Sequence, residues 1–331
     1  TKQLTLTCEN PHPTLGYPII THAFTGSPPP DAIIHIQSGG DETVIRHVNI
    51  RGPVTGEITY CGTLQPLTPD DPLSCMDTRA GIRIDADDCT VYDVSITRCM
   101  TGIYLTGTGN YINGNHIGDW YWTSAYPNPF DGLEAYWSRT NNLLTIHHPG
   151  NGFGIVAVEP DWTMPQGRQY ESRTQNRITD NIIRSNRYWG VVLTNGSRAE
   201  VAHNIIAWNG DYSVDNDWTA IPDKSGGVLS LFTADQISNS GNDNKLQAPI
   251  IRSNNIYGNK GYQIGVFTSA PGSGGDRCKQ IYNSPVIMSN TIGVEDNMQP
   301  GVPVEEYDFL ICAGPTPVST PSGDPPPCDP D

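Results

Sequence analysis

Two short phrases of alternating apolar and polar residues recur along the chain. In the first phrase a glycine is followed by apolar residues at every second position, which is the period of a short β-strand with one buried face. Seven copies are present, namely GIRID at Gly81, GIYLT at Gly102, GLEAY at Gly132, GIVAV at Gly154, GVVLT at Gly190, GVLSL at Gly227 and GVFTS at Gly265. Neighbouring copies lie 21 residues apart or more. The phrase therefore predicts repeated strands with insertions between some of them.

The second phrase carries an asparagine at both ends of six residues and an isoleucine at the third position. Its copies are NYINGN (110–115), NIIRSN (181–186), NIIAWN (204–209) and NNIYGN (254–259). In a stacked solenoid the same position recurs about 4.8 Å above itself, so side-chain amides at a turn can bond to one another and to unpaired backbone. Asparagine also tolerates the left-handed conformation of tight corners. We therefore predict a structural role for these asparagines and treat the four phrases as equivalent.

Joined together, the two phrases form one complete coil, best seen in GVVLTNGSRAEVAHNIIAWN from Gly190 to Asn209. This order of strand, turn, strand, asparagine turn and strand resembles the right-handed parallel β-helix of pectate-lyase-like proteins, over residues 32 to 295. The resemblance implies an all-β solenoid of about 22-residue coils with loop insertions. We expect the β-helix to occupy residues 32–313. Residues 1–31 are expected to form an N-terminal arm or cap, and residues 314–331 an extended, proline-rich tail.

Alternation after each glycine predicts two columns of side chains on the outer face of the sheet. The first contains Arg83, Tyr104, Glu134, Val156, Val192, Leu229 and Phe267. The second contains Asp85, Thr106, Tyr136, Val158, Thr194, Leu231 and Ser269. Most of these residues are apolar or aromatic, and so long an apolar surface is a liability when exposed. We therefore expect another segment or subunit to cover it.

Composition narrows the possible partners. The chain of 331 residues has 34 Gly and 28 Pro, which suits a turn-rich all-β protein. Its 19 basic and 35 acidic residues give a net charge of −16, which disfavours binding to nucleic acid. No apolar run is long enough for a membrane span.

The cysteines and the start of the chain point to the cell exterior. The eight cysteines lack C-x-x-C spacing, so disulfides in an oxidising compartment are favoured over buried free thiols. Cys61 and Cys75 are one candidate pair among 105 possible pairings. The chain begins at Thr1 without a leader, as a mature secreted protein would, and Asn195 lies in the glycosylation sequon NGS. We expect a secreted, extracellular or cell-surface protein.

Acidic and basic residues gather in the middle of the chain and supply the candidate catalytic residues. These are Asp131, Glu134, His147, Glu159 and Arg168. Two acids flanking a sugar bond would suit a glycoside hydrolase, and a base with a cation would suit a polysaccharide lyase. The alternative is that these are polar loop residues that satisfy turns.

Aromatic and acidic residues suggest two further kinds of site. The candidate sugar-binding aromatics are Trp120, Trp122, Tyr136 and Trp162. Such residues can stack on sugars, anchor a protein interface or cap the core. Asp85, Asp87 and Asp88 offer oxygen ligands that calcium prefers, although ordinary solvated turns also have this composition. We expect no other cofactor.

Two functional hypotheses result. The first is a non-catalytic extracellular structural protein, a β-helix subunit that self-associates through its terminal arms into a homopolymeric filament, sheath or surface layer. The alternative is a secreted carbohydrate-active enzyme, either a polysaccharide lyase or a glycoside hydrolase, or a glycan-binding adhesin. Polysaccharide is the partner in the second case.

Overall fold

The computed structural model describes the strands of the chain and the turns that join them. It covers residues 4–8, 17–21, 31–52, 79–118, 137–140, 143–146, 150–158, 175–186, 188–194, 197–210, 226–232, 248–259, 261–268, 285–293 and 306–313. The proline-rich segment 314–331 lies outside these ranges. Within them there is no helix with the length and apolar character needed to cross a membrane.

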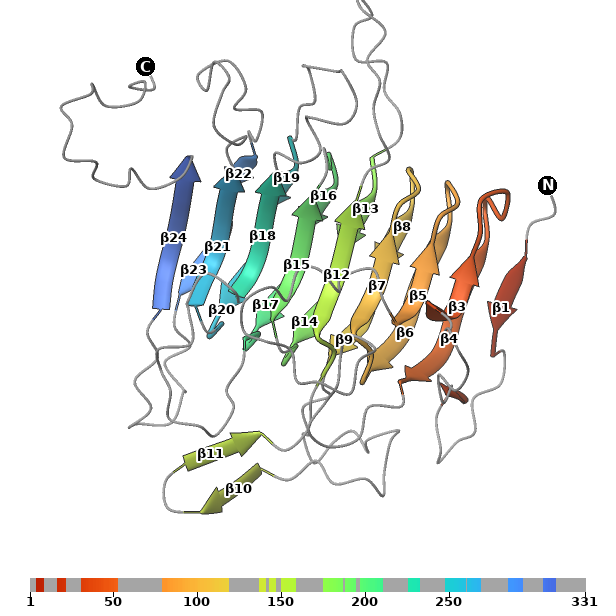
Figure 1. Cartoon of the computed structure of the whole chain (residues 1–331), viewed down its shortest axis with the longest axis horizontal. Coiled ribbons are helices and arrows are strands. Elements are labelled where there is room, and N and C mark those ends of the chain that lie inside the picture. Colours follow the sequence, from red (N-terminus) through yellow and green to blue (C-terminus); the bar gives the residue numbers. More distant parts are fainter. Residues whose placement is uncertain are drawn as a thin grey trace, which may run out of the picture.

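The strands stack into a solenoid with three faces (Figure 1). One face, called here the glycine face, is a parallel sheet of eight strands. Its strands are β3 (Ala32–Ile36), β5 (Ala80–Ile84), β7 (Thr101–Leu105), β12 (Phe153–Val158), β15 (Trp189–Thr194), β18 (Gly226–Phe232), β21 (Gly261–Thr268) and β24 (Glu306–Ala313). Each strand pairs in parallel with the strand of the next coil, so most of the glycine phrases mark a column of stacked strands.

The other two faces belong to one 14-stranded sheet that bends at a corner. The first narrow face contains β1 (Thr5–Thr7), β4 (Val44–Arg51), β6 (Thr90–Thr97), β8 (Tyr111–Asn113), β13 (Arg177–Thr179), β16 (Glu200–Ala202), β19 (Ile250–Arg252) and β22 (Val286–Met288). The second contains β2 (Ile19–Thr21), the later halves of β4 and β6, β9 (His116–Gly118), β14 (Ile182–Arg184), β17 (Ile205–Ala207), β20 (Asn255–Tyr257) and β23 (Thr291–Gly293). Apart from the three faces, β10 (Trp137–Thr140) and β11 (Leu143–Ile146) form an antiparallel pair.

The core follows from the central residue of each three-residue strand. On the second narrow face this residue is an isoleucine in eight successive strands, and each one pairs with the next along the solenoid. The column consists of Ile20, Ile50, Ile96, Ile117, Ile183, Ile206, Ile256 and Ile292. All but the first and the last are buried. Full burial of one such side chain contributes roughly 1.5–3 kcal/mol, so these columns supply much of the force that holds the coils together.

Asparagines stand at the corners in continuous ladders, as predicted. The Asn204 amide shows the pattern, because its Nδ2 donates to Ile178 O of the preceding coil at 2.8 Å. Its Oδ1 accepts the backbone N–H of Asn181 at 2.9 Å, and its own backbone N–H donates to Oδ1 of Asn254 at 3.0 Å. Each amide therefore joins three successive coils. The residue before it is left-handed, as at His203 with φ 58°.

Three such ladders run along the corners of the solenoid. The first contains Asn115, Asn181, Asn204, Asn254 and Asn290. The second contains Asn151, Asn186, Asn209 and Asn259, and the third contains Asn110 and Asn176. Thus the structural role predicted for the asparagine phrases is confirmed.

The predicted equivalence of the four asparagine phrases is wrong in one case. Tyr111 pairs with Arg177 and the N–H of Asn110 donates to Oδ1 of Asn176, so NYINGN lies on the first narrow face. NIIRSN, by contrast, lies on the second narrow face. Both faces have the same five-residue interval between corners, as NRITDN (176–181) also shows. The two faces therefore look alike in sequence.

Two cysteines occupy corner positions that asparagines hold in later coils. The backbone N–H of Cys89 donates to Oδ1 of Asn110, and that of Cys99 to Oδ1 of Asn151. Both side chains are buried free thiols, and Cys8 is also free, so the disulfide prediction is wrong for these three residues. Burial raises the pKa of Cys89 to about 11 and that of Cys99 to about 12. The remaining cysteines, namely Cys61, Cys75, Cys278, Cys312 and Cys328, have side chains outside the described part.

The N-terminal segment builds the first coil of its own chain. β1 and β2 both pair in parallel with β4, and β2 is held further by Tyr17. The hydroxyl of Tyr17 donates to Asp93 Oδ2 at 2.7 Å, its carbonyl accepts from Asn49 Nδ2, and its ring stacks on His47 at 5.3 Å. The hydrogen bond to Asp93 is the main cause that raises the pKa of Tyr17 to about 12. The described parts of the expected arm, residues 1–31, thus pair within the chain.

Candidate functional site

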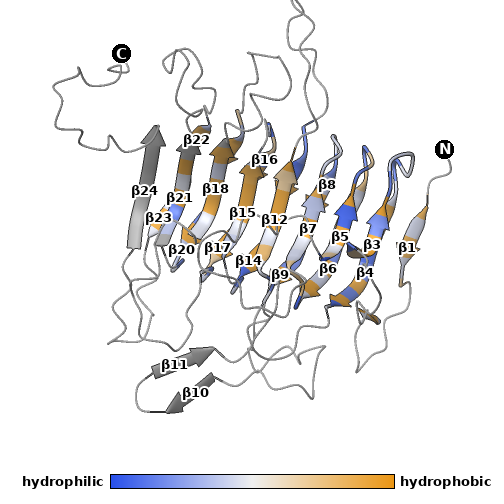
Figure 2. Cartoon of the chain, in the orientation of Figure 1, coloured by the Kyte–Doolittle hydropathy of each residue, from blue (hydrophilic) through white to orange (hydrophobic). Residues whose placement is uncertain are grey.

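Polar side chains gather at the N-terminal end of the glycine face. Figure 2 shows β12 and β15 mainly in the hydrophobic colour, whereas β5 carries hydrophilic positions. Here Asp85 receives a hydrogen bond from Arg83 Nε at 3.0 Å and another from Thr106 Oγ1 at 2.7 Å. The Nε2 atom of His35 lies 2.7 Å from the other carboxylate oxygen. We call these four residues the Asp85 cluster.

The contacts of Asp85 determine what the cluster can do chemically. Burial raises the pKa of Asp85, but the hydrogen bonds from Thr106 and His35 and the charge of Arg83 outweigh it and leave the pKa below its usual value. The carboxylate is therefore ionised at neutral pH and its two oxygens already accept several hydrogen bonds. The guanidinium of Arg83 also lies over the ring of Tyr104, at 5.3 Å from its centroid. Such a carboxylate is better suited to neutralising a nearby positive charge than to abstracting a proton from a substrate.

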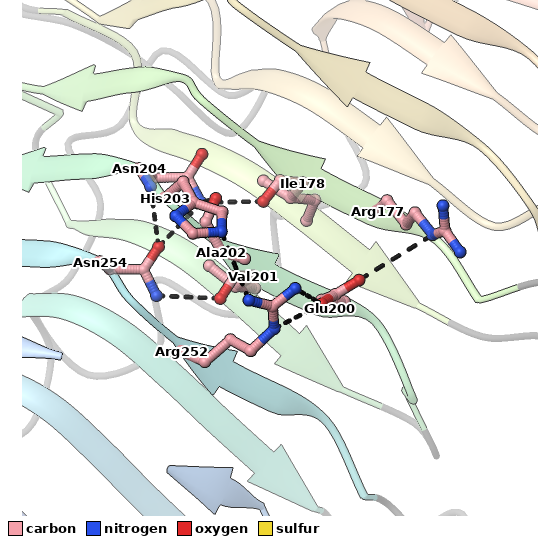
Figure 3. A network of polar contacts seen from close by, with 9 residues as sticks. All are labelled: Arg177, Ile178, Glu200, Val201, Ala202, His203, Asn204, Arg252 and Asn254. Carbon is pink, nitrogen blue, oxygen red and sulfur yellow. Dashed lines mark hydrogen bonds and ion pairs between the residues drawn. The ribbon is translucent and has the colours of Figure 1, made fainter. Parts of the chain in front are cut away.

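A second polar cluster crosses three coils of the first narrow face (Figure 3). Arg252 approaches Glu200 Oε1 with Nε at 2.7 Å and with Nη2 at 2.6 Å. Arg177 Nε lies 3.9 Å from the other oxygen of Glu200, and Arg252 Nη1 lies 3.3 Å from His203 Nε2. Glu200, Arg177, Arg252 and His203 are called the Glu200 cluster.

This arrangement arises because equivalent residues of successive coils are neighbours. Arg177 pairs with Glu200 in register, and Arg252 pairs with Ala202 two residues further along the same strand. The Glu200 side chain is 17% exposed and Arg177 is 61% exposed, so the cluster lies at the surface. Exposed ion pairs contribute about 0–1 kcal/mol each. The cluster carries more positive than negative charge, on a chain with a net charge of −16.

One half-buried histidine, His116, lies on the second narrow face. Burial is the main cause that lowers the pKa of His116 to about 4, and the charge of Arg184 lowers it further. The imidazole is therefore neutral at physiological pH. This residue belongs to the structural face of β9 rather than to either cluster.

Comparison with known proteins gives the family. A family described as right handed beta helix region matches residues 33–222, which is more than half of the chain. The chain belongs to the right-handed β-helix family. No curated protein matches it. The crystal structure of Dettilon tailspike protein (gp208) is similar at 14% identity over 87% of this chain, with a TM-score of 0.18. The chain spans 62% of the length of that protein, and a TM-score so low carries no argument about function.

The apolar middle of the outward columns on the glycine face is buried, as the sequence predicted. Val156 and Val192 are fully buried, and Tyr104, Leu229 and Leu231 are at most 9% exposed. In the first column Arg83 pairs with Tyr104, Tyr104 with Val156, and so on to Leu229. Together with Phe153 and Trp189 these residues form an apolar cluster distinct from the interior core. The burial expected for these apolar residues is therefore confirmed.

Two of the seven glycine phrases do not fit the β-helix as predicted. β7 pairs directly with β12, so no strand from GLEAY lies between them, and the placement of Glu134 and Tyr136 in the outward columns is wrong. GVFTS is shifted by two residues, because Leu229 pairs with Gly265 and Phe267 pairs with Leu231. A glycine followed by alternating residues thus occurs in this chain without marking the start of a coil.

The predicted catalytic and binding residues lie outside the described residues. These are Asp131, Glu134, His147, Glu159 and Arg168 among the catalytic candidates, Trp120, Trp122, Tyr136 and Trp162 among the aromatics, and the sequon residue Asn195. Their roles stay predictions. Neither described cluster was predicted as a group, although Asp85 was a candidate calcium ligand and Arg83, Asp85 and Thr106 were placed in the outward columns.

The three aspartates considered for calcium serve other contacts. Asp85 belongs to its own cluster, and Oδ1 of Asp87 accepts from the backbone N–H and hydroxyl of Thr108 at 2.6 and 3.0 Å. Asp88 occupies a left-handed turn position with φ 56°. Among the described residues, no three His, Cys, Asp or Glu side chains are grouped so as to hold a metal ion. The calcium prediction gains no support from this part of the chain.

Proposed function

We propose that the chain is a non-catalytic structural protein of the cell exterior, whose β-helix self-associates into a filament, sheath or surface layer. The observation that carries this proposal is the distribution of exposed large apolar side chains. Leu4, Leu6 and Ile19 are exposed on the first coil, and Val286 and Met288 are exposed on the last. Of the seven such residues in the described part, only Tyr111 and Ile205 lie elsewhere. Exposed apolar surface of this kind is typical of protein contacts.

The polar surfaces support the same proposal. The two charged clusters on the outer faces are paired internally, since Asp85 is bound by Arg83 and Glu200 by Arg252. Neither offers an unengaged carboxylate beside a second acid, which a glycoside hydrolase would need. The solenoid is instead held by amide ladders and isoleucine columns that run from coil to coil, which suits a rigid repeating element.

The proposal is tested with the purified full chain. We expect it to sediment and appear in electron micrographs as assemblies that grow with concentration, and to release no sugar from a panel of acidic and neutral polysaccharides. Protease added to intact producing cells should cut it, as an exterior location requires. A protein that stays monomeric at high concentration and degrades one polysaccharide would contradict the structural role.

A secreted carbohydrate-active enzyme or glycan-binding adhesin is the second candidate, because His35 and Asp85 lie 2.7 Å apart beside Arg83 on the outer face. If any polysaccharide is bound or cleaved, the variants Asp85→Asn and Glu134→Gln show whether the Asp85 cluster or the central segment that contains Glu134 is responsible. Loss of activity in Asp85→Asn alone would assign it to the Asp85 cluster. Loss in Glu134→Gln alone would assign it to the central segment predicted from sequence.

A further inference from the structure

The solenoid contains a whole number of coils, so its two ends match. Its first coil is β1, β2 and β3, and its last is β22, β23 and β24, one strand for each of the three faces. All three faces therefore begin at the first coil and end at the last coil. A second copy placed beyond the last coil would meet it with all three strands in phase. This is the geometric condition for a heterologous, non-closing contact that repeats along one axis.

The backbone at both ends carries complementary free groups. In seven coils of the first narrow face, a backbone N–H donates to the carbonyl one position earlier in the preceding coil, as Val286 N–H does to Pro249 O and Val44 N–H to Leu4 O. Continuing this rule beyond the last coil, Pro285 C=O would accept the N–H of Thr5 from a second copy. On the second narrow face the same rule joins Asn290 C=O to the N–H of Ile19. Unpaired strand edges of this kind are templates for another strand.

The side chains at both ends fit the same contact. Leu6 occupies the inward column that ends in Ile287, and Ile20 occupies the inward column that ends in Ile292. Stacking the copies would extend both columns across the junction. On the two narrow faces the described residues at these ends (4–8, 17–21 and 285–293) include no Asp, Glu, Lys or Arg, although the chain has a net charge of −16 and β24 on the glycine face carries Glu306 and Asp308. The strands of the two narrow faces are thus free of the like-charge repulsion that acts between other parts of the surface.

We infer that the partner of each end is a second copy of this chain, stacked head to tail so that β22 and β23 of one copy pair with β1 and β2 of the next. This inference rests on the proposed structural role and names the contact through which it works. The corner amides are not continued at the junction, because Pro18 stands where later coils have asparagine. The junction should therefore be weaker than a contact between coils of one chain, and assembly should be reversible on dilution.

The test uses two exposed outward positions that become neighbours only across the junction. Thr5 and Val286 lie in the same outward column, and both are exposed. In Thr5→Glu/Val286→Glu, like charges would face each other on adjacent strands. The concentration at which half of the protein is assembled should then rise about fivefold. In the matched control Thr5→Glu/Val286→Lys, opposite charges should restore assembly to the wild-type range or better.

A second variant tests the backbone contact. Thr5→Pro removes the N–H that points away from β4, so it should weaken assembly while leaving the bonds of Leu4 to β4 in place. Circular dichroism of each variant reports whether the solenoid is intact. If Thr5→Glu/Val286→Glu and Thr5→Pro are folded and assemble like wild type, the head-to-tail contact is refuted and assembly runs through the sides, while the structural role stands. If the wild type never assembles, both proposals fail.

Discussion

Replacing the buried corner residue Asn204 with alanine should cost far more stability than removing a polar side chain that is exposed on a strand. Asn204 is 1% exposed and makes contacts to the coils on both sides. Its Oδ1 accepts from the backbone N–H and from Nδ2 of Asn181, at 2.9 and 3.0 Å. Its Nδ2 donates to Ile178 O, to Ala202 O and to Oδ1 of Asn254, at 2.8, 3.0 and 3.0 Å.

The magnitude follows from which groups lose their partners. In Asn204→Ala the buried N–H of Asn181 has no acceptor left, which costs roughly 1–3 kcal/mol, and each remaining hydrogen bond contributes about 1 kcal/mol net. With some relaxation of the corner, we expect a loss of about 3–5 kcal/mol in the free energy of unfolding. Both neighbouring coils are affected, because in a solenoid each repeat is stabilised by its neighbours.

Equilibrium unfolding in urea, followed by far-ultraviolet circular dichroism, measures this loss. The matched control is Asn255→Ala, since Asn255 is the next residue of the same corner one coil later and is exposed. The control should change stability by less than about 0.5 kcal/mol. If Asn204→Ala costs no more than Asn255→Ala, the ladder does not stabilise the solenoid and the reasoning is refuted. Asn204→Asp keeps the acceptor but places a carboxylate beside Oδ1 of Asn254, so its stability should improve as the pH falls and the new acid becomes a donor.

Three further predictions follow from the described residues. In native protein at pH 8, Cys89 and Cys99 should resist modification by iodoacetamide, because burial raises the pKa of both thiols. In urea both thiols should react fully, and peptide mass spectrometry measures the extent of modification in each case. Rapid modification of the native protein would show that the thiols are accessible. Burial lowers the pKa of His116 from 6.5 to about 4, so as the pH falls the histidine is protonated in the unfolded chain before it is protonated in the folded chain. The free energy of unfolding should therefore decline between pH 6.5 and 4, by at most about 3 kcal/mol. That decline should be absent in His116→Asn, and an unchanged slope would assign it to other groups. A double-mutant cycle of Glu200→Gln and Arg252→Gln should give a coupling of about 1 kcal/mol or less that weakens in salt, and a larger salt-independent value would contradict a surface ion pair.

The architecture could be read from sequence because the corners impose specific residue types. An amide that must reach both neighbouring coils selects asparagine, and the central residue of a three-residue strand selects isoleucine, so both signals repeat with the coils. The sequence was less reliable for assigning each asparagine phrase to a face, because the two narrow faces share the same interval between corners. NYINGN and NIIRSN are therefore alike in sequence and differ in position. The first coil was taken for an arm because β1 and β2 lack both phrases, and only their pairing with β4 identifies them.

The described polar clusters could not be predicted as sites, because the residues are joined by stacking rather than by sequence. Glu200 and Arg252 are 52 residues apart, and their contact depends on how much of that interval forms an insertion. Arg83 and Asp85 were placed correctly on the outer face, but the partner His35 lies on β3, which carries no glycine phrase. The disulfide prediction failed for Cys89 and Cys99 because even cysteine counts do not reveal that a thiol can fill a corner position.

The direction of the amide ladders has a consequence for how the chain acquires its structure during synthesis. The backbone N–H of each corner asparagine donates to the side chain of the following coil, as Asn115 does to Asn181 and Asn181 does to Asn204. A coil leaving the ribosome therefore keeps an unsatisfied corner until the next one emerges and closes it. Folding should proceed as a growing front from the N-terminus, with the newest coil always the least protected against hydrogen exchange. A translation pause within an insertion between two coils would keep that front open until the next coil emerges.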